Sequence, residues 1–433
     1  MELKVLWKSN RLIGPAAFCA ALFLSAFCSA KSPIKVGILH SLSGTMAISE
    51  APLKDTLLML IQEQNRKGGL LGRPLQAVVV DPGSDDAVFA AKARELIISK
   101  DVDVVFGCWT SASRKAVLPI FEKLNSLLFY PVQYEAEESS RNVFYFGAAP
   151  NQQAIPAVDF LMSDAGGAVR RWALVGTDYV YPRTTNKILR AYLRFRGVSG
   201  FDIIERYTPF GHRDWRDIIR EVRDFSAVGL KTAVISTVNG DANIYFFKEL
   251  AHQGIDPKSL PVMAFSIGES ELSALNAQPL VGHLAAWNYF MSIDTPENEA
   301  FINGWRAYTG NKNAVTNDPM EAHYIGFQMW VDAVKQVGTT EVDAVRKAMY
   351  GRTVRNLTGS LAVMNSNHHL SKPVYVGKIQ ASGQFDLLWS ISEPVRGDAW
   401  SDFILDSAKL TADWTYPWLC GGCERPTFGQ TGK

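Results

Sequence analysis

The stretch FGCWTSASRKAVLPIFEKLNSLLFYPVQYE, residues 106–135, decides the fold of this chain. It opens with the end of an apolar run, breaks at Gly107 into small hydroxyl residues, and continues as a helix predicted to begin at about Ser113. A second apolar run, residues 127–130, follows that helix and ends in a polar and aromatic loop. Ligands of open parallel sheets bind outside the carboxyl ends of the strands, where helix N–H groups meet the loops. The stretch therefore predicts one edge of a ligand-binding cleft.

The side chains along this edge are mostly neutral hydrogen-bonding groups and aromatic rings. The candidate binding residues are Trp109, Thr110, Ser111, Tyr130, Gln133 and Tyr134. Neutral groups between aromatic walls indicate an uncharged polar ligand. Each aromatic ring has the alternative of ordinary packing in a core or between lobes. Ser111 and Ser113 have the alternative of capping the helix that begins there.

Strands and helices alternate along most of the chain. The first series has strands predicted at residues 34–39, 75–80, 102–106 and 127–130. The series begins again at Arg171, with strands predicted at 172–176, 202–206, 232–236 and 262–265. Such βαβ units imply parallel sheets with right-handed crossovers. Because 433 residues exceed what one core holds, the sequence predicts two α/β lobes.

The strand ends of the second series also carry polar loops. Their candidate residues are Asp178, Tyr179, Tyr181, Asn239, Asp241 and Glu269. The carboxylates among them are suited to bind N–H groups of a neutral ligand or the α-ammonium of an amino acid. Their alternative is to cap the turn in which each one lies. Two polar strand edges therefore face the predicted cleft.

Residues 1–30 have the composition of a secretory signal. Lys4, Lys8 and Arg11 precede an apolar segment at residues 16–27, and small residues lead to a cleavage site near Ala30. The apolar segment is shorter than the roughly 20 residues that span a bilayer, so we expect an exported, periplasmic protein. Removal of residues 1–30 leaves a net charge of about −1 with no cluster of Lys and Arg, which argues against nucleic-acid binding.

Three cysteines remain after the predicted cleavage. Cys420 and Cys423 form a CxxC pair that predicts a local disulfide rather than a metal site in an exported protein. Cys108 lies at the cleft edge, but a thiol nucleophile needs a base that the sequence does not assign, so catalysis is disfavoured. His368 and His369 are adjacent on a strand and point to opposite faces. We therefore expect neither a metal nor a cofactor.

In a series of blocks the chain resembles the substrate-binding proteins of urea ABC importers. The blocks are VGILHSLSGTMAISE, GCWTSASRKAVLP, YPVQYE, GAAPNQQ, GTDYVYPR, STVNGDAN, AAWNYF, DTP and NHHLSK. The chain is similar, more distantly, to the short-amide sensor of amidase operons. Both groups belong to the branched-chain amino-acid type of periplasmic binding proteins. The resemblance covers nearly all of residues 34–413.

The resemblance implies a type I periplasmic binding protein fold of class α/β. Two lobes with parallel sheets are joined by three crossovers, and the ligand binds between them. On this basis residues 31–149 with 285–355 form lobe 1, and residues 150–284 with 356–412 form lobe 2. Residues 413–433, rich in Gly, Pro and Trp, form an irregular tail.

The resemblance also implies which residues bind. Its blocks match Cys108, Trp109, Ser111, Tyr130, Pro131, Asp178, Tyr179, Tyr181, Asn239, Gly240 and Asp241. Val132 and Gln133 replace a Thr-Pro pair of the amide sensor, which favours the urea branch. The implied protein binds urea or a close short amide, performs no catalysis and delivers its ligand to a membrane permease. The alternatives are a branched-chain amino-acid receptor and an exported amide sensor.

Overall fold

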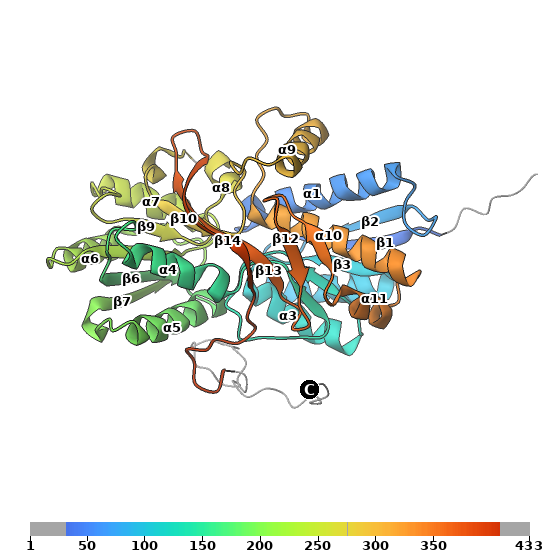
Figure 1. Ribbon diagram of the computed structural model, residues 1–433, viewed down its shortest axis with the longest axis horizontal. Coiled ribbons are helices and arrows are strands. Elements are labelled where there is room, and N and C mark those ends of the chain that lie inside the picture. The colour runs from blue at the N-terminus through green and yellow to red at the C-terminus, as the bar shows by residue number, and fades with distance from the viewer. Residues whose placement is uncertain (1–31, 275, 408–433) are drawn as a thin grey trace, which may run out of the picture.

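The chain folds into two α/β lobes that lie side by side along its long axis (Figure 1). The computed structural model describes residues 32–274 and 276–407. The predicted signal at residues 1–30, the predicted tail at 413–433 and its Cys420–Cys423 pair lie outside these residues. Within the described ranges no helix combines the length and the apolar character needed to cross a bilayer.

The first lobe is built on a sheet of five parallel strands in the order β2-β1-β3-β4-β5. The strands are β1 (Ile34–Leu39), β2 (Leu75–Val80), β3 (Val104–Gly107), β4 (Leu128–Tyr130) and β5 (Val143–Tyr145). Runs such as IKVGIL and VVFG are almost wholly buried, as expected for parallel strands covered on both faces. The carboxyl ends of β3 and β4 therefore lie together at one edge.

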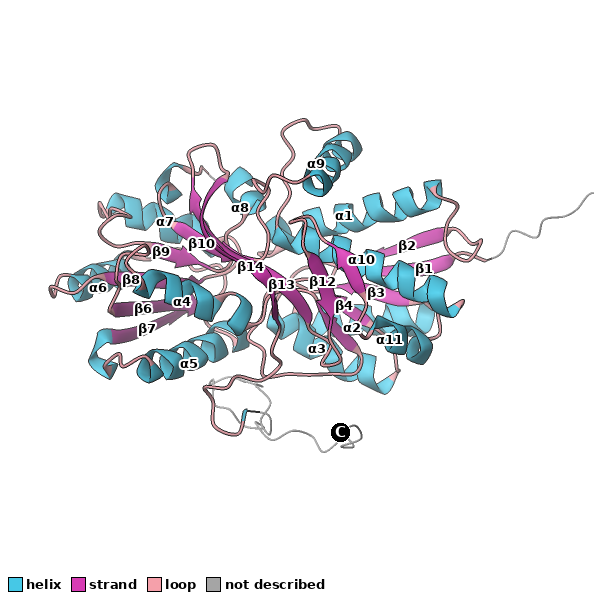
Figure 2. Ribbon diagram, viewed as in Figure 1, coloured by secondary structure: helices cyan, strands magenta, loops and turns pink. Residues whose placement is uncertain are grey.

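The second sheet continues parallel strands into an antiparallel extension. Its order is β11-β12-β13-β10-β9-β8-β6-β7, and β14 pairs with β13. The parallel part consists of β6 (Arg171–Thr177), β7 (Ile203–Thr208), β8 (Thr232–Thr237), β9 (Val262–Ala264) and β10 (Leu284–Trp287). The antiparallel part consists of β11 (Thr353–Arg355), β12 (Leu361–Met364), β13 (Leu370–Ile379) and β14 (Phe385–Arg396). The long strands β13 and β14 run through the middle of the molecule (Figure 2).

Helices cover the sheets of both lobes (Figure 2). In the first lobe they are α1 (Ala47–Arg66), α2 (Asp86–Arg94), α3 (Ser111–Lys123), α10 (Asp318–Val337) and α11 (Val342–Met349). In the second lobe they are α4 (Ala154–Met162), α5 (Val180–Phe195), α6 (Arg216–Ser226) and α7 (Ala242–His252). Two further helices, α8 (Glu269–Ala274) and α9 (Pro296–Thr309), lie between these groups in the chain.

Three passes of the chain between the lobes are tied together at Asn288. Its Nδ2 donates to the carbonyl of Gln152 at 3.1 Å and to that of Pro373 at 2.7 Å. Gln152 in turn donates to the carbonyl of Leu370 at 2.8 Å. Gln152, Asn288 and strand β13, which contains Leu370 and Pro373, belong to three different passes, so one small cluster of amides joins all three crossovers.

The second crossover begins later than the sequence predicted. The boundary predicted between residues 284 and 285 falls inside β10, which pairs with β9 and β13 in the second sheet. The chain returns to the first lobe only after Trp287, and α10 then packs against α1. The predicted boundary was wrong because β10 is placed in the second sheet partly by β13, a pairing partner far along the chain that leaves no local signal.

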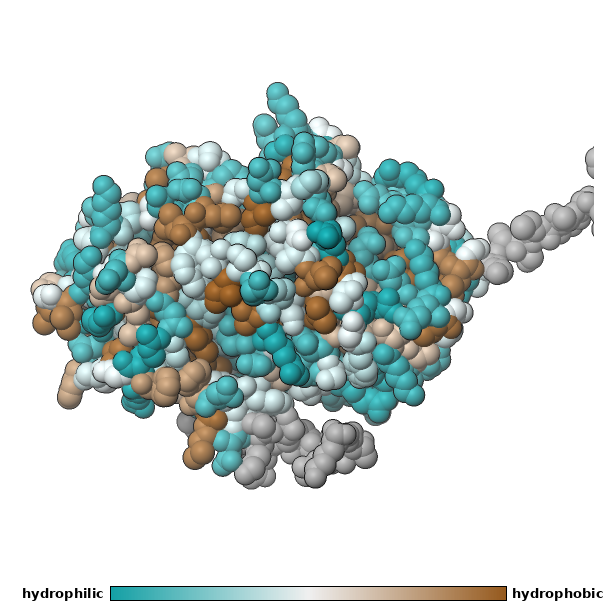
Figure 3. Space-filling view, in the orientation of Figure 1, coloured by the Kyte–Doolittle hydropathy of each residue, from teal (hydrophilic) through white to brown (hydrophobic). Residues whose placement is uncertain are grey.

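Hydrophilic and hydrophobic residues are mixed on the surface (Figure 3). On the face shown, hydrophobic groups are separated from one another by hydrophilic ones. The large aromatic side chains of the core, including Trp172, Trp287 and Trp330, are fully buried. Burial of a side chain of this size stabilises the fold by roughly 2–3 kcal/mol.

Candidate ligand-binding site

Helix α3 begins directly after the end of β3, at the edge that the sequence singled out. Thr110 caps the helix, because its Oγ1 accepts a hydrogen bond from the Ser113 N–H at 3.0 Å. Ser111 is the first residue of α3, and the Ser113 hydroxyl donates to the Thr110 carbonyl at 2.9 Å. The capping role considered for Ser111 and Ser113 was therefore wrong. The hydroxyl of Ser111 instead contacts the side chains of Arg114, in the same helix, and of Glu135, in the loop after β4.

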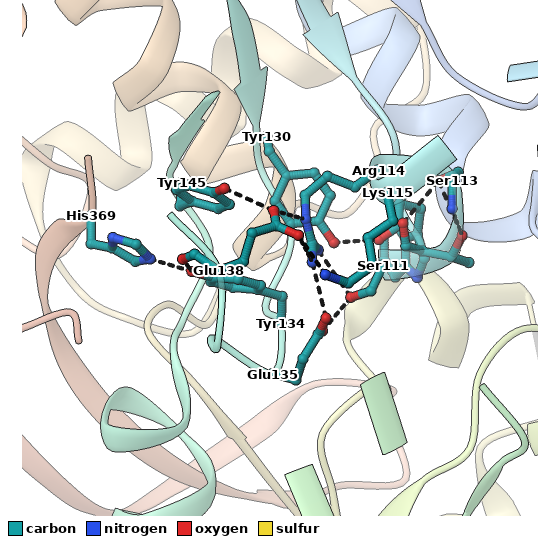
Figure 4. A network of polar contacts seen from close by, with 12 residues as sticks. Ser111, Ser113, Arg114, Lys115, Tyr130, Tyr134, Glu135, Glu138, Tyr145 and His369 are labelled. Carbon is teal, nitrogen blue, oxygen red and sulfur yellow. Dashed lines mark hydrogen bonds and ion pairs between the residues drawn. The ribbon is translucent and has the colours of Figure 1, made fainter. Parts of the chain in front are cut away.

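A buried ionic cluster surrounds Arg114, near the start of α3 (Figure 4). The Arg114 guanidinium donates to Ser111 Oγ at 2.9 Å, to Glu135 Oε1 at 3.0 Å and to Glu138 Oε1 at 2.9 Å. Glu135 also accepts a short hydrogen bond from Ser111, and Lys115 Nζ lies 2.7 Å from Glu138. Two cations face two carboxylates, so the cluster is neutral. This neutrality permits its burial.

The charges in this cluster hold one another in their ionised forms. Burial opposes the charge on Glu138, but the Arg114 and Lys115 cations outweigh it and hold the pKa of that carboxyl well below its usual range. For Arg114, burial acts against the charge, while Glu138 and Glu135 more than compensate and raise its pKa. Glu138 and Arg114 therefore both carry their charges at neutral pH.

Aromatic rings enclose the Arg114 guanidinium. Its central carbon lies 4.8 Å from the ring centre of Tyr130 and 4.6 Å from that of Tyr134. Tyr134 stacks on Tyr145 at 4.8 Å and makes a short hydrogen bond with His369. Such cation–π contacts stabilise a desolvated cation. Tyr130 and Tyr134, both predicted as ligand-binding residues, thus lie against Arg114.

The second lobe presents Tyr179 and Tyr181 at the start of α5. Both rings are buried and pack with Val180 against Ala112 of α3, which brings the two predicted edges together. Asp178 precedes them, but its Oδ1 accepts from Arg183 Nε at 2.7 Å. The structure therefore places the two tyrosines at the interface and engages the Asp178 carboxylate within its own lobe.

Direct hydrogen bonds from Gln133 and Ser49 join the lobes. Gln133 Nε2 donates to the Phe265 carbonyl at 2.8 Å and to Ser266 Oγ at 3.1 Å. Ser49 of α1 donates to Glu271 Oε1 of α8 at 2.6 Å. The predicted Gln133 therefore bridges from the first lobe to the end of β9 in the second.

The loop after β8 approaches the first lobe through its backbone. Gly240 has a φ of +68°, and a Cβ there would lie 2.9 Å from the Thr45 carbonyl oxygen. Glycine is the residue that accepts both constraints. Asn239 is held within its lobe, since its N–H donates to Thr177 Oγ1 at 2.9 Å. Asp241 follows as the N-cap residue of α7, without a side-chain capping bond.

Glu269 lies at the start of α8 and contacts the second crossover. Its Oε1 accepts from the Met291 N–H at 2.6 Å. Burial raises the pKa of Glu269 to about 8, although the Met291 N–H favours the charged form. Glu271 and Asp318 add negative charge nearby and raise this pKa further. The Glu269 carboxylate is thus hydrogen-bonded to the backbone of the second crossover.

Several buried polar atoms at the interface have no hydrogen-bond partner among the described residues. They are Trp109 Nε1, Gln133 Oε1, Tyr181 OH and Asp241 Oδ1. A buried polar atom without a partner costs about 1–3 kcal/mol, so folded proteins rarely leave several together. These atoms come from both lobes: Trp109 and Gln133 from the first, Tyr181 and Asp241 from the second.

The described residues offer little to a metal or to thiol chemistry. Between residues 32 and 407, position 275 apart, no group of three or more His, Cys, Asp or Glu side chains is arranged to hold a metal ion. Burial, reinforced by Glu50, raises the pKa of the Cys108 thiol well above its ordinary value. A thiol with such a pKa stays protonated at neutral pH.

The sequence of residues 34–406 matches the family described as "Periplasmic binding protein domain". The chain belongs to this family. This periplasmic binding protein is 24% identical over 369 residues to Leu/Ile/Val-binding protein homolog 6 of Brucella melitensis, covering 83% of this chain and 91% of the relative. It is 32% identical over 136 residues to a protein named limonene hydroxylase from Geobacillus stearothermophilus, covering 31% of this chain and 25% of that protein.

Solved structures of similar proteins share the fold of this periplasmic binding protein. A solute binding protein of an ABC transporter from Rhodopseudomonas palustris HaA2, in complex with p-hydroxybenzoic acid, has a TM-score of 0.74 at 19% identity, covering 84% of this chain and 98% of that one. A leucine binding protein from Thermotoga maritima has a TM-score of 0.70 at 16% identity, covering 83% and 99%. The predicted type I periplasmic binding protein fold is confirmed.

The sequence missed the ionic partners behind the site of this periplasmic binding protein. Arg114, Glu135 and Glu138 were not proposed as functional residues, although they lie within or next to the blocks that carried the resemblance. Their only sequence signal is spacing: Arg114 follows Ser111 by one helical turn, and the two glutamates lie three residues apart. Such residues are usually exposed, so spacing alone does not predict their burial.

Proposed function

We propose that this periplasmic binding protein binds urea, or a close short-chain amide, between its lobes and delivers it to the permease of an ABC importer. The observation that carries the proposal is the set of unpartnered polar atoms at the interface, which includes the indole N–H of Trp109 and the amide oxygen of Gln133. Urea offers four N–H bonds and one carbonyl, and such a set contains donors and acceptors for both.

Charge supports a neutral ligand. Arg114 is already paired with Glu135 and Glu138, and Arg183 with Asp178 at 2.7 Å. A ligand without net charge leaves these pairs intact and costs less to desolvate than an ion. In this proposal the site binds and releases its ligand unchanged, without a cofactor. A predicted signal cleaved near Ala30 and the family itself support a periplasmic location.

A branched-chain amino-acid receptor is the second candidate. The names of the Brucella relative and of the Thermotoga structure favour it. The first is named for binding Leu, Ile and Val, and the second for binding leucine. Such a ligand needs an anionic partner for its ammonium and a cationic or N–H-rich site for its carboxylate. An exported amide sensor would share the site and differ only in its partner.

Calorimetry separates the two candidates. Purified protein lacking residues 1–30 is titrated with urea, acetamide, formamide and leucine. We expect saturable heat with urea or one of the two amides and none with leucine. Binding of leucine in the absence of any urea or amide binding would reject the proposal in favour of the amino-acid receptor.

Tyr181→Phe is expected to weaken urea binding by about fivefold to tenfold with little loss of stability. The Tyr181 hydroxyl lies beside the Gln133 and Ser266 side chains, but none of the described residues makes a well-formed hydrogen bond with it. Its removal therefore costs the fold little, whereas a ligand that bonds it loses a partner. Calorimetry gives the affinity, and thermal unfolding gives the stability.

The matched control is Tyr289→Phe. The Tyr289 hydroxyl is bonded to Asn298 Oδ1 and to Thr316 Oγ1, each at 2.6 Å. This variant should lose about 1–2 kcal/mol of stability and retain the urea affinity. If Tyr181→Phe instead lost stability and kept its affinity, the hydroxyl would have no role in binding.

A further inference from the structure

Glu135 is the one buried carboxylate in contact with the first residue of α3. Its side chain is fully buried, and its Oε2 accepts a short hydrogen bond from Ser111. The start of a helix is the place where backbone N–H groups and the helix dipole favour a negative charge. In this chain the Glu135 carboxylate reaches the start of α3 through the Ser111 hydroxyl and the Arg114 guanidinium (Figure 4).

The second lobe lies close to the same carboxylate. Ala112, next to Ser111, packs against Tyr179 and Tyr181. Both tyrosines are buried, which raises the pKa of each hydroxyl, and the negative charge of Glu135 raises each pKa further. The charge of Glu135 therefore affects residues of the second lobe as well as residues of its own lobe. The unpartnered atoms of Trp109 and Tyr181 lie at the same interface.

Arg114, the cation beside Glu135, is already paired with two carboxylates. Arg114 bonds Glu135 at 3.0 Å and Glu138 at 2.9 Å, and Lys115 lies 2.7 Å from Glu138. A ligand carboxylate entering beside Ser111 would be a third anion for two cations. Like charges separated by a few ångströms in a desolvated site repel strongly. A neutral amide of the same shape meets no such repulsion.

We infer that Glu135 determines specificity by excluding ligands that carry a carboxylate, so that the site selects neutral amides over the corresponding acids. This inference rests on the proposed function and names the residue responsible for it. Leucine and p-hydroxybenzoic acid, named with two of the similar structures, both carry a carboxyl group. In this chain the Glu135 carboxylate already accepts the hydrogen bond that the Ser111 hydroxyl donates.

Acetamide and acetate test the inference, because they share size and shape and differ in charge. Calorimetry at pH 7 measures both ligands on the wild-type protein and on Glu135→Gln, which keeps the shape of the side chain and removes its charge. We expect the wild type to prefer acetamide by at least about tenfold, and Glu135→Gln to lower that ratio by at least about tenfold. Glu135→Ser is a second uncharged variant, should the glutamine variant fail to fold.

Glu138→Gln is the matched control. It removes one negative charge from the same cluster, on the side of Arg114 that contacts Tyr145. The ratio of its acetamide affinity to its acetate affinity should stay within about twofold of the wild-type ratio, because the charge removed does not contact Ser111. An equal change of the ratio in both variants would show that total charge, not Glu135, sets the preference.

The outcomes separate this inference from the proposed function. Wild-type protein that binds acetate as tightly as acetamide overturns the inference, as does a Glu135→Gln ratio equal to that of the wild type. In either case urea or amide binding would leave the proposed function standing. Failure of the wild type to bind urea, acetamide and formamide would overturn the proposed function itself. If neither uncharged variant folds, a wild-type preference for acetamide of less than about tenfold still overturns the inference.

Discussion

Replacing Arg114 by methionine is expected to lower the free energy of unfolding by about 3–5 kcal/mol. The substitution keeps a long unbranched side chain and leaves Glu135 and Glu138 buried without the cation that both contact. Removing one partner of a buried ionic cluster is costly because the remaining charges are neither solvated nor paired. Guanidinium chloride is the denaturant of choice, since urea is the proposed ligand.

Two further variants isolate the cause. Lys115→Met removes the more exposed cation of the cluster, whose side chain is 17% exposed, and should cost about 1 kcal/mol or less. Combining Arg114→Met with Glu135→Gln and Glu138→Gln should recover most of the loss, because no buried charge then remains unpaired. A cost for Arg114→Met no larger than that for Lys115→Met would contradict the assignment of Arg114 as the central cation.

The same cluster is expected to make the free energy of unfolding fall at acidic pH. The folded-state pKa of Glu138 lies below its ordinary value despite the opposing effect of burial, because Arg114 and Lys115 outweigh that effect. Its ionisation therefore contributes stability above the unfolded-state pKa, and that contribution disappears as the pH falls through the folded-state value.

The sequence predicted the parallel lobes well because their signals are local. Residues 34–39 and 75–80 were predicted as strands with the bounds that β1 and β2 have. Strand β5 (Val143–Tyr145) was missed, because three residues carry no periodic pattern and the strand is defined by its pairing with β4. The individual strands of the antiparallel extension were not predicted, since pairing partners far along the chain leave no local signal.

The candidate site shows the same division between local and distant causes. Trp109, Thr110 and Ser111 were found from the strand end that precedes them, and the structure puts Thr110 at the cap. The ionic cluster was missed because Arg114 meets its carboxylates 21 and 24 residues away in the chain. Burial of a charge depends on its partner, and the partner is a property of the fold.

Glu269→Gln is expected to stabilise the protein at alkaline pH by about 3–5 kcal/mol relative to the wild type. Burial, the first cause, raises the pKa of Glu269 to about 8 from an ordinary value of 4.5. Each unit of such a shift corresponds to about 1.4 kcal/mol. Glutamine keeps an oxygen that can accept from the Met291 N–H and carries no charge to bury.

The sign of the pH dependence follows from proton binding. Between about pH 4.5 and pH 8 the folded state keeps the proton on Glu269, whereas the unfolded state releases it. Stability due to this group is therefore complete below pH 4.5 and falls as the pH rises toward 8. Unfolding with guanidinium chloride at several pH values should show the variant and the wild type diverging over this range and running parallel above it.

The variant also separates two roles for Glu269, which the sequence proposed as a ligand-binding residue. Its contact with Met291 belongs to the crossover after β10, so in the structure the carboxylate joins α8 to the passage between the lobes. Retained urea affinity in Glu269→Gln at pH 7 would assign the residue to the crossover, whereas a large loss of affinity would assign it to the ligand. Glu299→Gln, at an exposed position of α9, controls for the loss of one negative charge. A stability difference between Glu269→Gln and the wild type that does not grow with pH would contradict the raised pKa and the burial that causes it.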